Sequence, residues 1–288
     1  MAWREHLIAT TSRFVESGLA DHKFVTELTS GDDQKLWSCL SEALVAARVA
    51  DLNPVPRGQG RGPDFLINGP KGRIWIEVVC PGPGDLPKSW TEQTFGVARS
   101  VPHEAILLRW TSAIKAKAEA LLGSADGASP GYLAAKVVAP EDAYVIAVNG
   151  CRLRGGVFSQ FEGISQYPNA VEAVFPVGPM QITINRDSLE VVDRGHQFRP
   201  YIIKTSGAHV PADTFLDPRF SPISAVWALD LNGESVFGNR EALAVVHNPL
   251  ARVSLPIGLL PGDAEYVAEP GEDEYVLKNI KQPPAYGA

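Results

Sequence analysis

Asp64 and Glu77 are the residues of this sequence whose types and spacing could do chemistry together. Asp64 follows Gly62-Pro63 at the start of one expected strand, and Glu77 lies midway along the next. In a tight hairpin these positions converge at one end of a sheet. Carboxylates held close together repel each other, and a divalent cation between them relieves the repulsion. Mg²⁺ suits such a site, because it takes one or two carboxylates and keeps several waters for a phosphate group and a nucleophile.

The elements that must position this pair can be predicted from the surrounding sequence. Apolar residues recur at helical spacing after Asp33, where Asp32 or Asp33 is a suitable N-cap, and the segment HEAILLRWTSAIKAKAEALL has the same character. Gly/Pro-rich breaks bracket short segments rich in β-formers, and AYVIAVN is apolar nearly throughout. We therefore expect a helix over 33–50, strands near 53–57, 64–68 and 73–80, a helix over 103–122 and a strand over 143–149.

Pro63-Asp64, the short hairpin and Glu77 resemble the motif of the PD-(D/E)XK nuclease superfamily. The expected order of helix, three strands, helix and strand over residues 33–149 is similar to the restriction-endonuclease-like core of that superfamily. The resemblance implies an α/β protein that is a metal-dependent nuclease, with Asp64 and Glu77 binding Mg²⁺ and Mn²⁺ as a substitute. It also implies nucleic acid as the partner, DNA in the first place. Restriction-type enzymes of this fold often act as dimers, which leaves a homodimer open.

The sequence departs from the superfamily pattern at Val79. A lysine is expected there, two residues after the glutamate, where it helps orient or deprotonate the attacking water. Strand alternation places Val79 on the same face as Trp75 and Glu77, with Ile74, Ile76 and Val78 on the other. The missing lysine supports an alternative function, a catalytically inactive nuclease-fold module that binds nucleic acid or a protein partner.

Lys117 could replace the missing lysine from the following helix. At about 100° per residue, it falls about 20° from Ile106, inside the apolar stripe, whereas Lys115 falls near 180° on the open face. An inward ammonium needs a partner, and Glu77 or a phosphate at the metal site would serve. The alternative is that the Lys117 stem lies along the core and its charge reaches water.

Glu42 and Arg109 are additional candidates. The superfamily often has a glutamate on its first helix that joins the metal site, and Glu42 matches that placement. On a helical wheel, however, Glu42 lies about 140° from the centre of the apolar stripe, as a solvated residue would. Arg109 borders the buried face of its helix and could meet a phosphate or form a surface salt bridge. A local basic rim of Arg57, Arg61, Lys71 and Arg73 is a further alternative to an ordinary solvated hairpin.

The chain divides by pattern into four segments. They are an N-terminal helical segment (1–32), the nuclease-like core (33–149), a strand-rich extension of the same domain (150–260) and an acidic tail (261–288). The expected strands of the extension are AVEAVF, MQITINR, LEVVD, PYIIKT, ISAVWALD and ALAVVHNP. The last segment holds six acids and two lysines, a balance of −4, so the other 260 residues carry only −3 of the net charge of −7. The net charge argues mildly against a dedicated nucleic-acid coat protein, because phosphate binding is driven by Lys and Arg.

Composition bounds the class of protein. Hydrophobic residues make up 45% and charged residues 20% of the 288, which is typical of a globular chain. No apolar run approaches the roughly 18–20 residues of a membrane helix, and the N-terminus lacks the features of a signal peptide. The three cysteines, Cys39, Cys80 and Cys151, fit no zinc spacing. Their use suits a reducing cytoplasm better than a disulfide framework.

Overall fold

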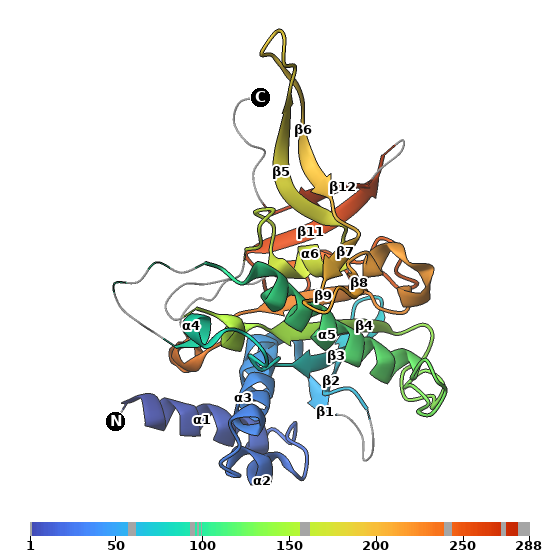
Figure 1. The fold of residues 1–288 in the computed structure, drawn as a ribbon. Helices are drawn as coiled ribbons and strands as arrows, with labels where there is room; N and C mark the ends of the chain where they lie inside the picture. The colour runs from blue at the N-terminus through green and yellow to red at the C-terminus, as the bar shows by residue number, and fades with distance from the viewer. Residues whose placement is uncertain are drawn as a thin grey trace.

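An eight-stranded mixed sheet crosses the centre of the protein (Figure 1). The computed structural model describes residues 2–56, 62–92, 96, 98, 100–155, 162–238, 244–271 and 275–281. The sheet order is β1 (Val55–Pro56), β2 (Phe65–Gly69), β3 (Gly72–Val79), β4 (Ala143–Asn149), β9 (Ala225–Leu229), β10 (Ala244–His247), β11 (Ala264–Pro270) and β12 (Tyr275–Asn279). The first three strands are antiparallel, while β3, β4 and β9 are mutually parallel. The fold is therefore mixed α/β.

Helices cover both faces of this sheet. On one face lies α3 (Asp33–Arg48), with α1 (Ala2–Glu16) and α2 (Phe24–Leu28) packed against it. On the other face lie α5 (His103–Leu122) and α6 (Asn169–Val174). A single helical turn, α4 (Lys88–Thr91), precedes α5. Burial on both sides explains why every residue of β4 is buried and apolar residues dominate it.

Local sequence signals account for the two long helices. Asp32 caps α3, because its side chain accepts a hydrogen bond from the amide of Lys35 at 2.9 Å. Gly123 ends α5 with φ +98°, a backbone conformation that glycine adopts easily. The expected helix over 103–122 and strand over 143–149 are confirmed residue for residue, and the expected helix over 33–50 ends two residues earlier.

The alternation expected for the third strand is also confirmed. Ile74, Ile76 and Val78 join the apolar cluster under α3. Trp75 and Val79 join the cluster under α5. Glu77 therefore lies on the α5 side of the sheet, among residues of the second cluster.

A long hairpin projects away from this body. It consists of β5 (Val177–Ile184) and β6 (Val191–Phe198), drawn in yellow at the top of Figure 1. These two strands pair only with each other among the described residues. A second small pair, β7 (Tyr201–Ile203) and β8 (His209–Pro211), follows it.

Two sequence predictions for the second half are wrong. The first five residues of AVEAVF, 170–174, lie within helix α6 and not in a strand. All six residues of that helix are buried, so neither a helical nor a strand period marks it. The acidic segment is not simply a tail, because β11 and β12 take up residues 264–270 and 275–279 of it. A count of charged residues could not reveal these strands, because it does not distinguish exposed acids from Glu265, which is buried and accepts hydrogen bonds from Gly258 N. No helix within the described ranges is both long and apolar enough to span a membrane.

Candidate functional site

Asp64 and Glu77 lie opposite each other at the end of the β2–β3 ladder. The last pair of the ladder is Phe65 with Ile76, so the next position on each strand is Asp64 and Glu77. One oxygen of Asp64, Oδ2, accepts a hydrogen bond from the amide of Val78 at 2.7 Å. This bond fixes the Asp64 carboxylate against the backbone of β3. The expected convergence of the two acids is therefore what the hairpin geometry produces.

Lys117 reaches the same place from helix α5. Its Nζ donates a hydrogen bond to Glu77 Oε1 at 2.7 Å, which is also an ion pair. The Glu77 side chain is 6% exposed and that of Lys117 is 24% exposed. Lys115, two residues earlier, is 74% exposed and faces Glu119 at 3.7 Å. The helical-wheel prediction of an inward Lys117 and an outward Lys115 is confirmed.

The two carboxylates keep the Lys117 amine charged. Burial alone lowers the pKa of the Lys117 ammonium, but the charges of Glu77 and Asp64 and the hydrogen bond that Lys117 donates to Glu77 outweigh burial. The net result is a pKa raised above the ordinary lysine value. Lys117 is consequently a cation and hydrogen-bond donor at neutral pH, and its positive charge interacts with both Glu77 and Asp64.

Tyr144 lies beside Lys117 and Glu77. The sequence interpretation missed this residue, because it treated AYVIAVN only as a buried strand. It pairs in register with Trp75 on the neighbouring strand and therefore faces α5. Its hydroxyl donates to the carbonyl of Lys117 at 3.4 Å. Burial, then the charge of Glu77, raises the pKa of the Tyr144 hydroxyl well above its ordinary value, so the phenol stays neutral. The phenolic oxygen within a mostly aliphatic strand was the available signal.

The donor set at this site fits a hard divalent cation in kind. Asp64 and Glu77 offer carboxylate oxygens, and Mg²⁺ binds through one or two carboxylates with waters completing its coordination. Groups of three or more His, Cys, Asp or Glu that could hold a metal do not occur in the described part of the chain. The site is thus a two-carboxylate set, which suits Mg²⁺ or Mn²⁺ and does not suit an all-protein Ca²⁺ cage or a structural zinc site.

Glu42 lies in the other helical layer. It is half-buried on α3, whose apolar residues cover the Ile74 and Ile76 face, opposite to Glu77. Its charge acts on Cys39, where burial, then Glu42, raises the pKa of the thiol to about 12. The described contacts of Glu42 do not assign it to the Asp64–Glu77 pair, so its role at the metal remains a prediction.

Arg109 supports the loop that follows β3. Its Nε donates to the carbonyl of Gly82 at 2.8 Å. Gly84 has φ +53°, and a Cβ there would come within 2.9 Å of Arg109 Nη1. The guanidinium therefore fills the space beside this glycine and holds the Pro-Gly loop. Neither of the two sequence alternatives, a phosphate contact or a salt bridge, describes this contact.

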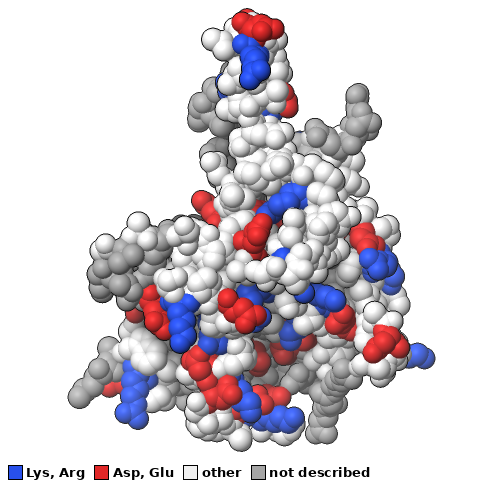
Figure 2. Space-filling view, in the orientation of Figure 1, with Lys and Arg blue, Asp and Glu red and all other residues white. Residues whose placement is uncertain are grey.

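The basic rim expected around the hairpin is described only in part, since Arg57 and Arg61 lie outside the described residues. Arg73 makes a bidentate pair with Asp142, both contacts at 2.9 Å, and Trp75 Nε1 donates to the same carboxylate. Arg73 is therefore structural. Figure 2 shows basic and acidic side chains interspersed over the face in view, not gathered in one basic patch.

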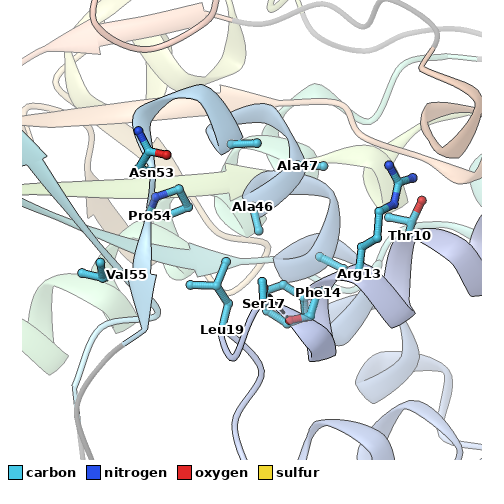
Figure 3. Close-up of a pocket in the computed structure, with 12 residues that line it drawn as sticks. Thr10, Arg13, Phe14, Ser17, Leu19, Ala46, Ala47, Asn53, Pro54 and Val55 are labelled. Carbon is cyan, nitrogen blue, oxygen red and sulfur yellow. Dashed lines mark hydrogen bonds between the residues drawn. The ribbon is translucent and has the colours of Figure 1, made fainter.

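The pocket drawn in Figure 3 belongs to a different part of the fold. It has a volume of about 510 Å³ and opens between α1, α3 and the start of β1, with Phe14, Leu19 and Ala46 among the apolar residues that line it. Asp64, Glu77 and Lys117 do not line it. The candidate site, on the α5 side of the sheet, is therefore separate from this pocket.

Comparisons of the chain with protein-family models, with curated proteins and with solved structures give no match.

Proposed function

We propose that this protein is a metal-dependent nuclease that hydrolyses phosphodiester bonds in nucleic acid, DNA in the first place. One observation carries the proposal: the Lys117 amine lies 2.7 Å from Glu77, whose cross-strand neighbour is Asp64. Three groups that phosphodiester hydrolysis can use thus meet at one place, although the strand position expected for the lysine holds Val79. The order α3, β1, β2, β3, α5, β4, interrupted only by the single turn α4 before α5 and the 3-10 turn at 50–52 among the described residues, supports a restriction-endonuclease-like core, as does the parallel pairing of β4 with β3.

The chemistry follows from the charges of the three groups. Asp64 and Glu77 would hold Mg²⁺, which supplies Lewis-acid stabilisation of the charge that develops on the phosphoryl group. Lys117 stays protonated because its pKa is raised. We assign it the role of a donor that binds a phosphate oxygen or orients the attacking water, and not that of the base. Water adds to phosphorus and the bond to the leaving oxygen breaks. The proton of the water passes to a carboxylate oxygen or to solvent, and the leaving oxygen takes up a proton from solvent.

A second candidate function is favoured by the same ion pair. Lys117 neutralises Glu77 directly, so the site can persist without a metal as a structural pair between helix and sheet. In that case the protein binds nucleic acid or a protein partner without cutting. This candidate predicts binding that survives EDTA and no cleavage in any divalent metal.

The test is cleavage of supercoiled plasmid and of single-stranded DNA in Mg²⁺ and in Mn²⁺. We expect metal-dependent cleavage that Asp64→Asn and Glu77→Gln each reduce by about 10²-fold or more, and that Lys117→Met reduces by a similar factor. Lys115→Met is the matched control, because Lys115 sits on the same helix and points into solvent. It should leave the rate unchanged.

Titration of Mn²⁺ by calorimetry separates the two candidates without relying on the right substrate. The nuclease proposal requires Mn²⁺ binding that Asp64→Asn abolishes and Lys115→Met preserves. Cleavage that persists in both Asp64→Asn and Glu77→Gln would show that the site lies elsewhere. Absence of both cleavage and Mn²⁺ binding would refute the nuclease and favour the binding module.

A further inference from the structure

A polar pocket opens where the base of the β5–β6 hairpin meets β11 and β12 (Figure 1). Its volume is about 560 Å³, within the range of about 300–1,000 Å³ typical of small-molecule sites. Three parts of the chain line it: residues 162 and 165–167 of the loop before α6, His196 of β6, and Tyr266, Leu277 and Asn279 of β11 and β12. We call it the aromatic pocket.

Three aromatic rings meet in the aromatic pocket. The ring centre of Tyr167 lies 4.9 Å from that of His196, with 43° between the two planes. It lies 5.7 Å from the ring centre of Tyr266, and these two planes stand at 84°. The Tyr167 and Tyr266 rings therefore form two walls at nearly a right angle. The face of an aromatic ring carries a partial negative charge that attracts an organic cation.

The charge of the aromatic pocket also favours a cation. Among the described residues that line it, Glu162 is the one acid and none is Lys or Arg. Burial, then the neighbouring Tyr167 and Glu162, raises the pKa of the Tyr266 hydroxyl to about 12, so this hydroxyl stays neutral. The charge of Glu162 thus acts on the inner wall of the pocket, where a positive group would be stabilised.

The loop that carries Tyr167 is fixed in place by a buried charge. The amide and the hydroxyl of Ser165 both donate to Glu172 Oε1, and the Ser165 hydroxyl accepts from the amide of Tyr167. The amide of Gly163 donates to the carbonyl of Tyr167 at 2.7 Å. Gln166, at the tip, has φ +70°, which a residue with a side chain adopts only where its surroundings impose it. This wall therefore exists before a ligand arrives, which lowers the cost of binding.

The other two walls are fixed as well. His196 Nδ1 lies 3.0 Å from the carbonyl oxygen of Gly178, to which it can only donate, so the orientation of the ring is set. Tyr266 is paired in register with Asn279 across β11 and β12. Asn279 Oδ1 accepts from the amide of Glu265 at 3.1 Å, so its side chain is held against the sheet.

Three other classes of ligand fit this lining poorly. A phosphate or carboxylate would meet Glu162 with no basic side chain in the described lining to offset the repulsion. An apolar ligand would bury the Glu162 carboxylate and the phenol hydroxyls without partners. A primary ammonium is strongly hydrated and loses that hydration on entry. A quaternary ammonium is recognised instead through the faces of aromatic rings.

We propose that the aromatic pocket binds a small quaternary alkylammonium ion between the rings of Tyr167, His196 and Tyr266, with Glu162 as the counter-charge. The inference goes beyond the proposed nuclease function and does not rest on it, because Asp64, Glu77 and Lys117 do not line this pocket.

The test is calorimetric titration of the whole chain with tetramethylammonium and with choline, at constant ionic strength. Titration to about 20 mM reveals a dissociation constant of about 1 mM. We expect saturable binding at one site. The uncharged carbon analogue of choline, in which a quaternary carbon replaces the nitrogen, should bind about 5-fold more weakly or worse, because it lacks the attraction to the rings and to Glu162.

Two substitutions and their matched controls locate the binding. Glu162→Gln should weaken choline binding by about 5-fold or more and leave the carbon analogue unaffected, whereas Glu190→Gln, in the turn between β5 and β6, should change neither. Tyr167→Leu should weaken choline binding by a similar factor, and Tyr167→Phe, which keeps the ring, should stay within about 2-fold. Tyr201→Leu removes a ring that contacts His209 outside the pocket and should have no effect.

Three results would overturn the proposal. The first is the absence of saturable binding for both tetramethylammonium and choline. The second is equal affinity for choline and its carbon analogue, which would show that the pocket does not recognise charge. The third is choline binding that neither Glu162→Gln nor Tyr167→Leu weakens, which would place the binding elsewhere. Glu162 is exposed, so Glu162→Gln should keep the circular dichroism spectrum of the unaltered chain.

Discussion

Replacing Lys117 with methionine tests the energetics on which the candidate site depends. Methionine keeps the length and the apolar contacts of the stem but removes the charge that faces Glu77. Removing one partner of a fully buried ion pair costs about 3–5 kcal/mol, because the other charge stays buried and uncompensated. Glu77 is 6% exposed but Lys117 is 24% exposed and partly hydrated, so we expect a loss of about 2–3 kcal/mol in the free energy of unfolding at pH 7.5.

The pH dependence of this loss has a defined sign. In the unaltered chain Lys117 has a raised pKa, so the stabilisation is fully present below the ordinary lysine value of about 10.4 and is lost only as the pH rises through the raised value. It is therefore constant between pH 5 and 7.5. In Lys117→Met, Glu77 can relieve its burial by taking up a proton, which is easier at lower pH. The variant should recover part of the lost stability at pH 5.

Urea unfolding without divalent metal measures these quantities for five chains: the unaltered chain, Lys117→Met, Glu77→Gln, the double variant and the control Lys115→Met. The double variant should recover at least about half of the Lys117→Met loss, because the uncompensated charge is gone. Lys115→Met should stay within about 0.5 kcal/mol of the unaltered chain. A Lys117→Met loss below about 0.5 kcal/mol, or losses that simply add in the double variant, would refute the buried pair as an energetic unit.

Three further predictions concern sites that hold the sheet and its helices together. Asp142 accepts hydrogen bonds from Arg73, Trp75 and the amide of Ala139, so Asp142→Ala should lower the free energy of unfolding by about 3 kcal/mol in thermal or urea melts; an effect under 1 kcal/mol would contradict this role. Burial raises the pKa of Glu172, but hydrogen bonds from His103 and Ser165 outweigh it and the net pKa is lowered. Its stabilisation is therefore present above the ordinary value of about 4.3 and is lost as the pH falls below it, and acid titration of Glu172→Gln should lack this component. A Cβ at Gly131 would lie 2.3 Å from Gly123 N and Leu121 O, so Gly131→Ala should destabilise by about 2 kcal/mol or more, whereas Gly195→Ala, in open space, should be close to neutral.

Predictions from the sequence succeeded where the structure is governed by local periodicity. The helix at 103–122 has an apolar stripe along its whole length and a glycine after its last residue, so both its extent and the direction of Lys117 followed from geometry. The alternation of β3 likewise assigned Glu77 to the α5 side. These two local periods meet at the site, which is why the Lys117–Glu77 contact could be predicted from residues 40 positions apart.

Predictions failed where a residue's environment is made by distant segments. Helix α6 is buried on all sides by the sheet, α5 and the base of the hairpin, so its sequence NAVEAV has no exposed polar face to reveal a helix. Glu172 within it is satisfied by His103 and Arg199, which are far away in the sequence. Glu265 similarly pairs with His247 at 2.8 Å, so an acid counted toward a solvated tail is in fact inside the sheet. Arg109 was correctly predicted at the border of the buried face of its helix. Its partner, the Gly82 carbonyl in the loop after β3, depends on a turn that composition does not specify.

The location of Lys117 on a helix and not on β3 links the site to the mechanics of layer packing. A lysine at position 79 would share a strand with Glu77, and their separation would be fixed by the backbone. Lys117 is instead joined to Glu77 only through the packing of α5 on the sheet, where Ile114 and Leu121 lie in the core one turn to either side of it. A small slide or tilt of α5, such as a cavity beneath Leu121 would permit, would separate the ammonium from the carboxylate without altering either residue. The Lys117–Glu77 contact therefore reports on how tightly α5 packs against the sheet.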